Sequence, residues 1–339
     1  MLIKEIQTTS FRLLGSKHFE FDTGVTVIFG NNATGKTSLL EAIGYAMRAK
    51  SITHSKDYEV PTFGSSSFAV SAKLEGEKNI STTVCWDERK TVQMNGKSVR
   101  SGKELVEVMK MVAITPATSQ IATGAPSARR EFLDDTASQI NSGWANTISD
   151  YRSTLTERNA WLKNEFGGRN MFEVLTDSII KLGTQVREIR EQVVQELRMS
   201  LAEERIAFNF TSSGDLSKDE FRKVFPKEKA REQTVIGPNK DDWSLNLSSH
   251  QVDRFASTGE ARKVTLALKL AQARLIARLT GIEPIILADD LFAELDKSRA
   301  SQALTQMESF GQAFITCAQM PPQGNYVLIE SNSWADHRN

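Results

Sequence analysis

The strongest constraint on the fold is a glycine-bounded loop that separates an apolar run from a segment with helical spacing. The apolar run covers 25–29, and the helical segment covers 39–43. The pattern between them is G-x-x-x-x-G-K-[ST], which in this strand–loop–helix context is typical of a phosphate-binding loop, because its glycines let successive N–H groups converge on one anion. The loop residues are Gly30, Asn31, Asn32, Ala33, Thr34, Gly35, Lys36, Thr37 and Ser38.

The loop also carries the side chains that a nucleotide requires. Lys36 would reach the β- and γ-phosphates of ATP, and the hydroxyl of Thr37 would bind Mg²⁺. The alternative is a chance glycine turn, which average residue usage produces in about one chain in a hundred of this length. The strand before the loop and the helix after it lower those odds further, and we therefore expect nucleotide binding.

An apolar segment that ends in two acids supplies the second half of a nucleotide site. The segment 285–288 is followed directly by Asp289 and Asp290. We expect Asp289 to hold Mg²⁺, directly or through water, and Asp290 to orient or deprotonate the attacking water. Many buried strands end in a capping Asp, so this pattern alone is weak. It gains weight from the phosphate-binding loop upstream and from Ala-Glu-Leu-Asp at 293–296, whose Asp296 is a further candidate catalytic residue.

A Ser-x-Gly motif opens an expected helix at 258–280. Ser257 and Glu260 form the Ser-x-x-Glu pattern of a capping box, which is the purely structural interpretation. A capped helix start is also a phosphate-binding surface, so the two interpretations are compatible. In ATP-binding-cassette ATPases this motif faces the γ-phosphate held by a second subunit, and it precedes the paired acids by a few tens of residues, as it does here. Ser257 and Gly259 are therefore candidate catalytic residues.

The remaining sequence alternates between strand-rich and helix-rich stretches. Residues 2–29 and 68–95 contain short runs typical of strands, and Asn95-Gly96 is a hairpin turn signal. From about 102 to 232 the patterns are mainly helical, and most charges there are expected on solvated faces. We therefore predict an α/β P-loop ATPase head with an inserted, mainly α-helical lobe. The expected parts are 1–106, the N-terminal part of the head; 107–236, the helical lobe; and 237–339, the C-terminal part of the head.

Composition and charge set broad limits on compartment and partners. The 339 residues include 42 basic and 42 acidic side chains, so any DNA binding must come from local basic patches. Cys85 and Cys317 cannot make a disulfide framework and fit a reducing compartment. The first residues lack a signal pattern, and no apolar run approaches the length that crosses a membrane. We expect a cytoplasmic protein without a membrane partner.

Five separated motifs, taken together and in order, resemble those of one known family. They are the phosphate loop with its helix at 30–43, Arg-Arg-Glu-Phe-Leu-Asp at 129–134, a Tyr…Leu…Arg-Asn helix at 151–163, Thr-Val-Ile-Gly-Pro-Asn-Lys-Asp-Asp at 234–242, and the Ser-x-Gly region at 255–262. On these motifs the chain resembles the RecF family of bacterial DNA replication and repair proteins. Heads of that family are similar to those of structural-maintenance-of-chromosomes (SMC) proteins, which makes the expected fold an ABC/SMC-like head.

The chain departs from the family pattern at several positions. Asn239-Lys240 replaces the family's His-Arg, and Glu260 stands where Gln is usual. Ala117-Thr118 stands where Glu-Asp is usual after Pro116. Arg12 resembles a family residue near the nucleotide, although a plain surface arginine is the alternative.

The resemblance implies a function and a set of partners. Two subunits would sandwich two ATP molecules with Mg²⁺ and close around double-stranded DNA, and slow ATP hydrolysis would reopen the dimer. The partners would be RecO and RecR, which promote RecA loading at gaps, and the protein would work at the nucleoid. ATP would thus be a switch for dimerisation and DNA binding.

Five other classes of protein also carry a phosphate-binding loop or a related head. A transporter ATPase would have a switch histidine after the last strand, but 316–319 reads Thr-Cys-Ala-Gln. A small-molecule kinase would not need the Ser-x-Gly motif or Asp296. An SMC protein proper would need hundreds of heptad residues between the two nucleotide motifs. A different ABC/SMC-type clamp, or an ATP-binding scaffold with negligible turnover, remains open at this stage.

Overall fold

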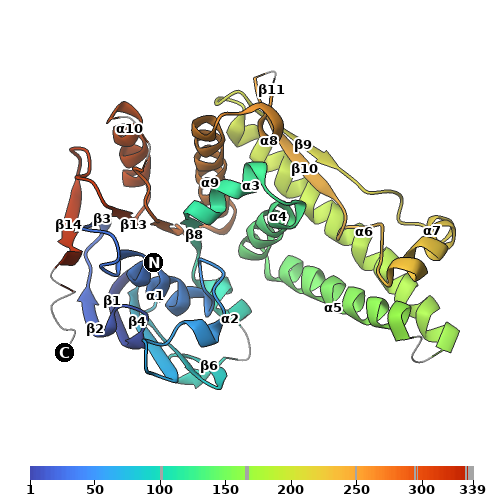
Figure 1. Cartoon of the computed structure of the whole chain (residues 1–339), viewed down its shortest axis with the longest axis horizontal. Helices are drawn as coiled ribbons and strands as arrows, with labels where there is room; N and C mark the ends of the chain where they lie inside the picture. The colour runs from blue at the N-terminus through green and yellow to red at the C-terminus, as the bar shows by residue number, and fades with distance from the viewer. Residues whose placement is uncertain are drawn as a thin grey trace. The chain divides into compact units, whose positions relative to one another are not determined.

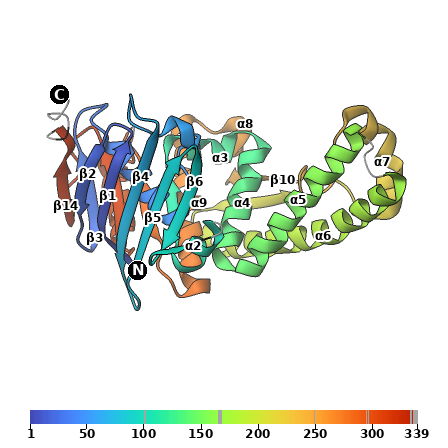
Figure 2. The ribbon, with the colours of Figure 1, turned by 90° about the horizontal axis from the view of Figure 1, so that it is seen from below.

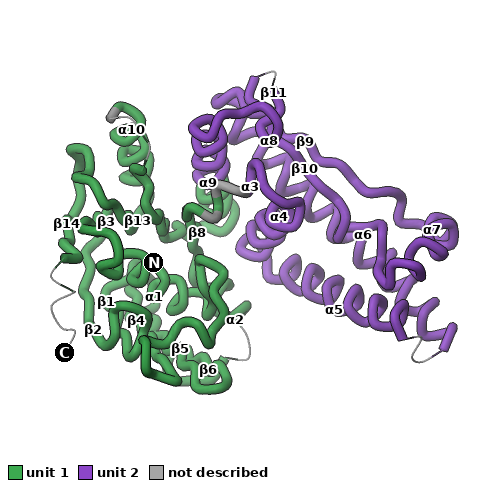
Figure 3. Tube along the Cα trace, in the orientation of Figure 1, with its two compact units in different colours: residues 1–119, 272–339 green, residues 120–271 purple. Residues whose placement is uncertain are grey.

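The chain forms two compact units. The computed structural model describes residues 1–99, 102–164, 168–248, 250–293, 295, 297–332 and 334. The first unit comprises residues 1–119 and 272–339, and the second comprises residues 120–271 (Figure 3). This division differs from the expected boundaries at 106/107 and 236/237. The difference arises because β8 (Met111–Ile114) pairs with strands of the first unit, whereas β10 (Asp242–Leu247) pairs within the second.

A parallel sheet in the first unit carries the phosphate-binding loop (Figure 1). Its strand order is β14-β3-β13-β12-β8, and each neighbouring pair is parallel. All residues of β12 are buried, as expected for a parallel sheet covered on both faces. The carboxyl ends of β3, β13 and β12 meet at one edge of this sheet, where ligands of open parallel sheets bind. The bounds are β3 (Gly24–Phe29), β12 (Ile285–Ala288), β13 (Gln312–Cys317) and β14 (Tyr326–Glu330).

An antiparallel sheet forms the other layer of the first unit (Figure 2). Its strand order is β2-β1-β4-β5-β6-β7. The expected turn at Asn95-Gly96 is confirmed, since both residues have positive φ (52° and 75°) and join β6 to β7. The bounds are β1 (Leu2–Phe11), β2 (Gly15–Glu20), β4 (Ser67–Glu75), β5 (Ile80–Asp87), β6 (Arg89–Met94) and β7 (Lys97–Ser98).

Helix α1 (Lys36–Arg48) contacts strands of both sheets and lies at the centre of their shared core. Its side chains Leu39, Leu40 and Ile43 are fully buried. The helix begins at the last residues of the phosphate-binding loop, so its packing fixes that end of the loop. The other helical elements of this unit are η1 (Asp57–Glu59), α2 (Gly102–Val108), η2 (Pro116–Ser119) and α10 (Lys297–Glu308).

Two long helices, α5 (Ser142–Asn164) and α6 (Gly168–Leu201), pack side by side in the second unit (Figures 1 and 2). Both lie within the stretch from about 102 to 232 in which mainly helical structure was expected. A small antiparallel sheet has the order β11-β10-β9. The remaining elements are α3 (Gln120–Thr123), α4 (Pro126–Ile140), β9 (Ile206–Thr211), α7 (Lys218–Arg231), β11 (His250–Gln251), α8 (Val252–Phe255) and α9 (Thr258–Thr280), of which α9 continues into the first unit.

Several charges of the helical stretch are buried in ion pairs rather than solvated. Arg158 and Glu228 are both fully buried, and their shorter N–O contact is 2.6 Å. Arg190 pairs with the buried carboxylate of Asp134 at 2.8 Å. Breaking such a pair by removing one partner costs about 3–5 kcal/mol, because the other charge stays buried. Arg158 and Arg190 therefore stabilise the second unit through these pairs.

Cys85 and Cys317 are free, and burial raises the pKa of the Cys317 thiol to about 11, which keeps it protonated. Among the helices of the described residues, none combines the length and the apolarity that crossing a bilayer needs.

Candidate functional site

The phosphate-binding loop joins β3 to α1, as the sequence predicts. Gly30 and Gly35 have φ values of 152° and 99°, which suit glycine. Ala33 also has positive φ, at 63°, so the loop holds a strained residue of the kind found at ligand sites. The N–H of Leu39 donates to the carbonyl of Gly35 at 3.1 Å, which closes the first turn of α1 directly after the loop.

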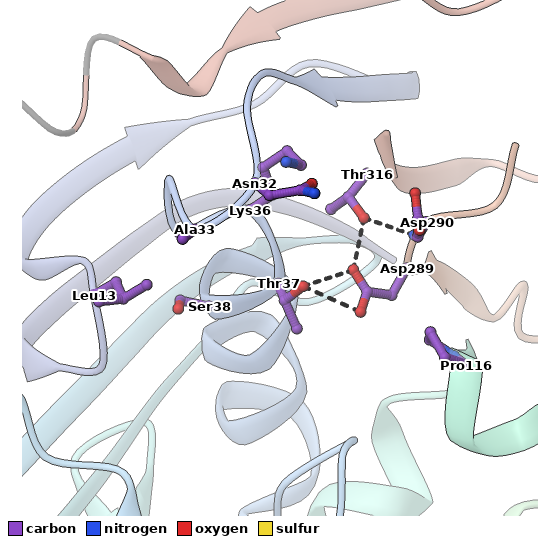
Figure 4. A pocket seen from close by; sticks show the side chains of 11 residues that line it. Leu13, Asn32, Ala33, Lys36, Thr37, Ser38, Pro116, Asp289, Asp290 and Thr316 are labelled. Carbon is purple, nitrogen blue, oxygen red and sulfur yellow. Dashed lines mark hydrogen bonds between the residues drawn. The ribbon is translucent and has the colours of Figure 1, made fainter. Parts of the chain in front are cut away.

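A pocket of about 300 Å³ lies over this loop (Figure 4). It joins the loop to the ends of β12 and β13, so the two expected halves of the nucleotide site meet. Asn32, Ala33, Gly35, Lys36, Thr37, Ser38, Asp289 and Asp290 line it, together with Leu13, Pro116 and Thr316.

Lys36 is held by the loop itself. Its Nζ donates to the carbonyls of Gly30 at 2.7 Å and Asn31 at 2.6 Å. Burial lowers the pKa of Lys36 from its ordinary value, while the nearby carboxylates of Asp290 and Asp289 oppose this shift. Lys36 thus provides a cation to the pocket, and two loop carbonyls keep it in place.

Thr37 and Asp289 place two oxygens where a magnesium ion would need them. The hydroxyl of Thr37 donates to Oδ1 and Oδ2 of Asp289 at 2.9 and 3.1 Å. Neighbouring oxygens of an octahedral Mg²⁺ site also lie about 2.9 Å apart, and Mg²⁺ prefers such hard ligands. Among the described residues no group of three or more His, Cys, Asp or Glu could hold a metal by itself. The pair therefore fits a Mg²⁺ ion that completes its shell with water and phosphate oxygens.

Thr316 links the two acids and was missed by the sequence analysis. Its hydroxyl donates to Asp289 Oδ1 at 2.6 Å and accepts from the N–H of Asp290 at 2.8 Å. Thr316 is buried at the end of β13, next to β12 in the sheet. A polar residue that ends an apolar strand beside the paired acids was the signal that could have found it.

Asp290 has a strained backbone, with φ at 52°. An L-residue other than glycine rarely adopts this conformation, and such strain clusters at functional sites. The exposed side chain of Asp290 lines the pocket beside Asp289. The role predicted for Asp290, to orient or deprotonate an attacking water, requires such a position in the pocket.

The Ser-x-Gly motif lies in the second unit. Its Ser257 forms the expected capping box with Glu260. The hydroxyl oxygen of Ser257 accepts from the N–H of Glu260 at 3.3 Å, and Glu260 Oε2 accepts from the N–H of Ser257 at 2.9 Å. Helix α9 begins at Thr258, as predicted. Apart from neighbouring backbone, no heavy atom of the described residues lies within 4 Å of the position that a Cβ on Gly259 would take. Local packing therefore does not explain this glycine.

Two further candidate residues have different outcomes. Arg12 is not among the described residues that line the pocket. Its guanidinium donates to Ser55 at 2.7 Å and lies 3.5 Å from the buried carboxylate of Glu41. Asp296 lies outside the described residues, so its position stays a prediction.

Comparison with known proteins decides the family. The family model described as RecF/RecN/SMC N terminal domain matches residues 2–323. A DNA replication and repair protein RecF from Chlorobium luteolum is 32% identical over 93% of this chain and 94% of its own length. The chain belongs to the RecF family. Another RecF protein, from Moorella thermoacetica, is 30% identical and covers 98% of this RecF-family chain and 94% of its own length.

Solved structures agree with this assignment. A structure of the recombination mediator protein RecF with ATP, from the RecFOR pathway, has a TM-score of 0.89 at 25% identity and covers 97% of this chain and 95% of its own. An Smc head bound to the C-winged helix domain of ScpA has a TM-score of 0.53 at 13% identity, over 94% of this chain and 90% of its own, and it shows the fold alone. The predicted ABC/SMC-type head with its helical lobe is therefore confirmed.

Proposed function

We propose that this chain is an ATP-dependent, double-stranded-DNA-binding protein of recombinational repair. It would act in the cytoplasm at the nucleoid, with RecO and RecR, to help load RecA at gaps. One observation carries the proposal: a RecF-family chain brings its phosphate loop and its paired acids into one pocket. The names of its relatives, RecF proteins of replication, repair and the RecFOR pathway, support the cellular role.

The pocket residues divide the work of binding and hydrolysing ATP. Lys36 and the loop N–H groups would neutralise and orient the β- and γ-phosphates, and Thr37 and Asp289 would hold Mg²⁺, which stabilises charge that develops on the phosphate oxygens. Asp290 would orient the attacking water and accept its proton. Asp is one methylene shorter than the Glu that is common here in cassette ATPases, so turnover should be slow, below about 1 s⁻¹.

Slow turnover suits a switch in which ATP favours a closed dimer. Ser257 and Gly259 are exposed, and the space beside Gly259 is open among the described residues. A glycine inside a helix costs about 1 kcal/mol relative to alanine, so an unexplained one favours close approach of another molecule. The ATP held by a second copy is that molecule in our proposal. ATP binding then stabilises the dimer, because its γ-phosphate contacts both copies.

Replacing Ser257 with arginine separates this role from helix capping. We expect the variant to bind ATP as a monomer but to lose ATP-driven dimerisation. The arginine side chain, which is larger than serine and carries a positive charge, would collide with the phosphate-binding region of the other copy. If Ser257 only caps α9, the same change costs about 1 kcal/mol of stability and leaves dimerisation intact. Sedimentation with ATP, together with a thermal unfolding curve, distinguishes the two results.

DNA binding should depend on ATP and fall with salt despite the zero net charge. Closing the dimer would bring basic groups of two copies onto one duplex, and such phosphate contacts release counterions. With about six contacts, affinity would fall about a thousandfold between about 50 and about 200 mM salt. Filter binding of duplex DNA with ATP, with ADP and without nucleotide measures this. Equal affinity in all three conditions would refute the closure of an ATP-dependent dimer on DNA, while the ATPase assignment would stand.

A further inference from the structure

Residues that follow β14 lie directly beside the phosphate-binding loop. β14 pairs parallel with β3, and the register places Glu330 opposite Phe29. Since the two strands run in the same direction, the next residues of each also lie side by side. Gly30 begins the phosphate-binding loop on one strand, and Ser331 follows the other.

Ser331 and Asn332 make three side-chain contacts with the loop region. The Ser331 hydroxyl, which is fully buried, donates to the carbonyl of Phe29 at 3.1 Å and lies 2.6 Å from the hydroxyl oxygen of Thr34. Asn332 Oδ1 accepts from the N–H of Asn31 at 2.9 Å. The contacts reach both the start and the middle of the loop, and they come from residues about 300 positions away in sequence.

The bond to Asn332 also orients the carbonyl that holds Lys36. The N–H of Asn31 and the carbonyl of Gly30 belong to one planar peptide group, in which they point in opposite directions. With the N–H fixed on Asn332, the Gly30 carbonyl points to the other side, where it accepts from Lys36 Nζ at 2.7 Å. Loss of the Asn332 acceptor would free this peptide to rotate and would release one of the two carbonyls that hold the lysine.

The first glycine of the loop is shaped to the same two side chains. A Cβ on Gly30 would lie 2.3 Å from Ser331 Oγ and 2.8 Å from Asn332 Oδ1, so only glycine leaves room for them. The close approach of Ser331 and Asn332 thus explains why the loop begins with this residue.

We infer that Ser331 and Asn332 are positioning residues for the nucleotide. They hold the loop in its binding shape before ATP arrives, so that less order must be imposed when the phosphates bind. This inference rests on the proposed ATP site and names residues outside the nucleotide motifs as determinants of its affinity.

Asn332→Ala tests the inference on an exposed side chain that the fold does not depend on. The matched control is Asn325→Ala, an exposed asparagine just before β14 whose side chain has no contact with the loop among the described residues. In full-length protein we expect Asn332→Ala to weaken ATP binding about tenfold, as loss of one well-made hydrogen bond would. The Asn325→Ala control should match wild type in ATP affinity and in turnover.

Hydrogen–deuterium exchange without nucleotide measures the loop directly. The loop peptide should exchange faster in Asn332→Ala than in wild type or the control, and Asn332→Asp, which keeps an acceptor oxygen, should restore slow exchange. Unchanged exchange, or wild-type ATP affinity, in Asn332→Ala would overturn the inference. Failure of the wild-type protein to bind ATP would instead refute the ATP site itself, so the two failures are distinguishable.

Discussion

Replacing Lys36 with alanine should weaken ATP binding by about a hundredfold or more. Lys36 is the cation that two loop carbonyls hold inside the pocket, near the carboxylates of Asp289 and Asp290. Truncating one partner of a buried, hydrogen-bonded charge pair costs about 2–5 kcal/mol, and each 1.4 kcal/mol is about tenfold in affinity. Titration of the folded variant with ATP by calorimetry measures the change.

The matched control for this experiment is Lys97→Ala. Lys97 is exposed in β7, away from the pocket lining. The Lys97→Ala variant should bind ATP as the wild-type protein does, because surface substitutions usually change stability by less than about 0.5 kcal/mol. A folded Lys36→Ala protein with the affinity of the control would refute the assignment of the phosphate loop.

We expect Asp290→Asn to bind ATP but to lose ATP hydrolysis. The amide has nearly the shape of the carboxylate, yet it cannot accept the proton of the attacking water. Thr37 and Asp289 remain in place to hold Mg²⁺, so nucleotide affinity should be preserved. A positioned general base contributes about 10²–10⁴-fold, so single-turnover hydrolysis should fall at least about a hundredfold. The variant should therefore accumulate as the ATP-bound dimer.

Asp87→Asn provides the control for the loss of charge. Asp87 is an exposed residue at the end of β5. The Asp87→Asn variant should hydrolyse ATP at the wild-type rate. Hydrolysis in Asp290→Asn at the rate of this control would show that another residue acts as the base. Asp289→Asn should behave differently from Asp290→Asn, because it loses Mg²⁺-dependent affinity as well.

Features set by short stretches of chain could be predicted from the sequence. The loop at 30–38 depends on the local turn chemistry of its glycines, and the capped helix α9 begins and ends at the predicted residues because its pattern is strongly periodic. The two acids after β12 could be predicted because they directly follow an apolar run in the sequence. In each case the residues that specify the structure lie within one element or at its ends.

Features set by pairing between distant segments could not be predicted in this way. Thr316 enters the site because β13 lies beside β12, and Ser331 because β14 lies beside β3. A single sequence does not specify which strands become neighbours. The two compact units divide at other residues than the expected parts for the same reason, since the partners of β8 and β10 are far away in sequence.

Buried charge is a second feature that local patterns conceal. Arg158 sits among polar residues of a helix whose charges are expected to be solvated, yet it is fully buried against Glu228 from α7. Its partner lies 70 residues away, so no spacing rule within the helix could identify the pair. Such pairs stabilise the second unit but take no part in the ATP pocket.

In the proposed dimer, two copies of the chain share each ATP. A mixture of two variant subunits tests this sharing most directly. Lys36→Ala lacks the cation of the phosphate-binding loop, and Ser257→Arg lacks an intact Ser-x-Gly motif. Neither variant alone should therefore dimerise or hydrolyse ATP. In a mixture of the two folded proteins, one composite site combines the intact pocket of one chain with the intact Ser257 of the other. We predict that the mixture regains ATP hydrolysis and an ATP-dependent dimer in sedimentation velocity. A mixture that remains monomeric and inactive would contradict the shared site.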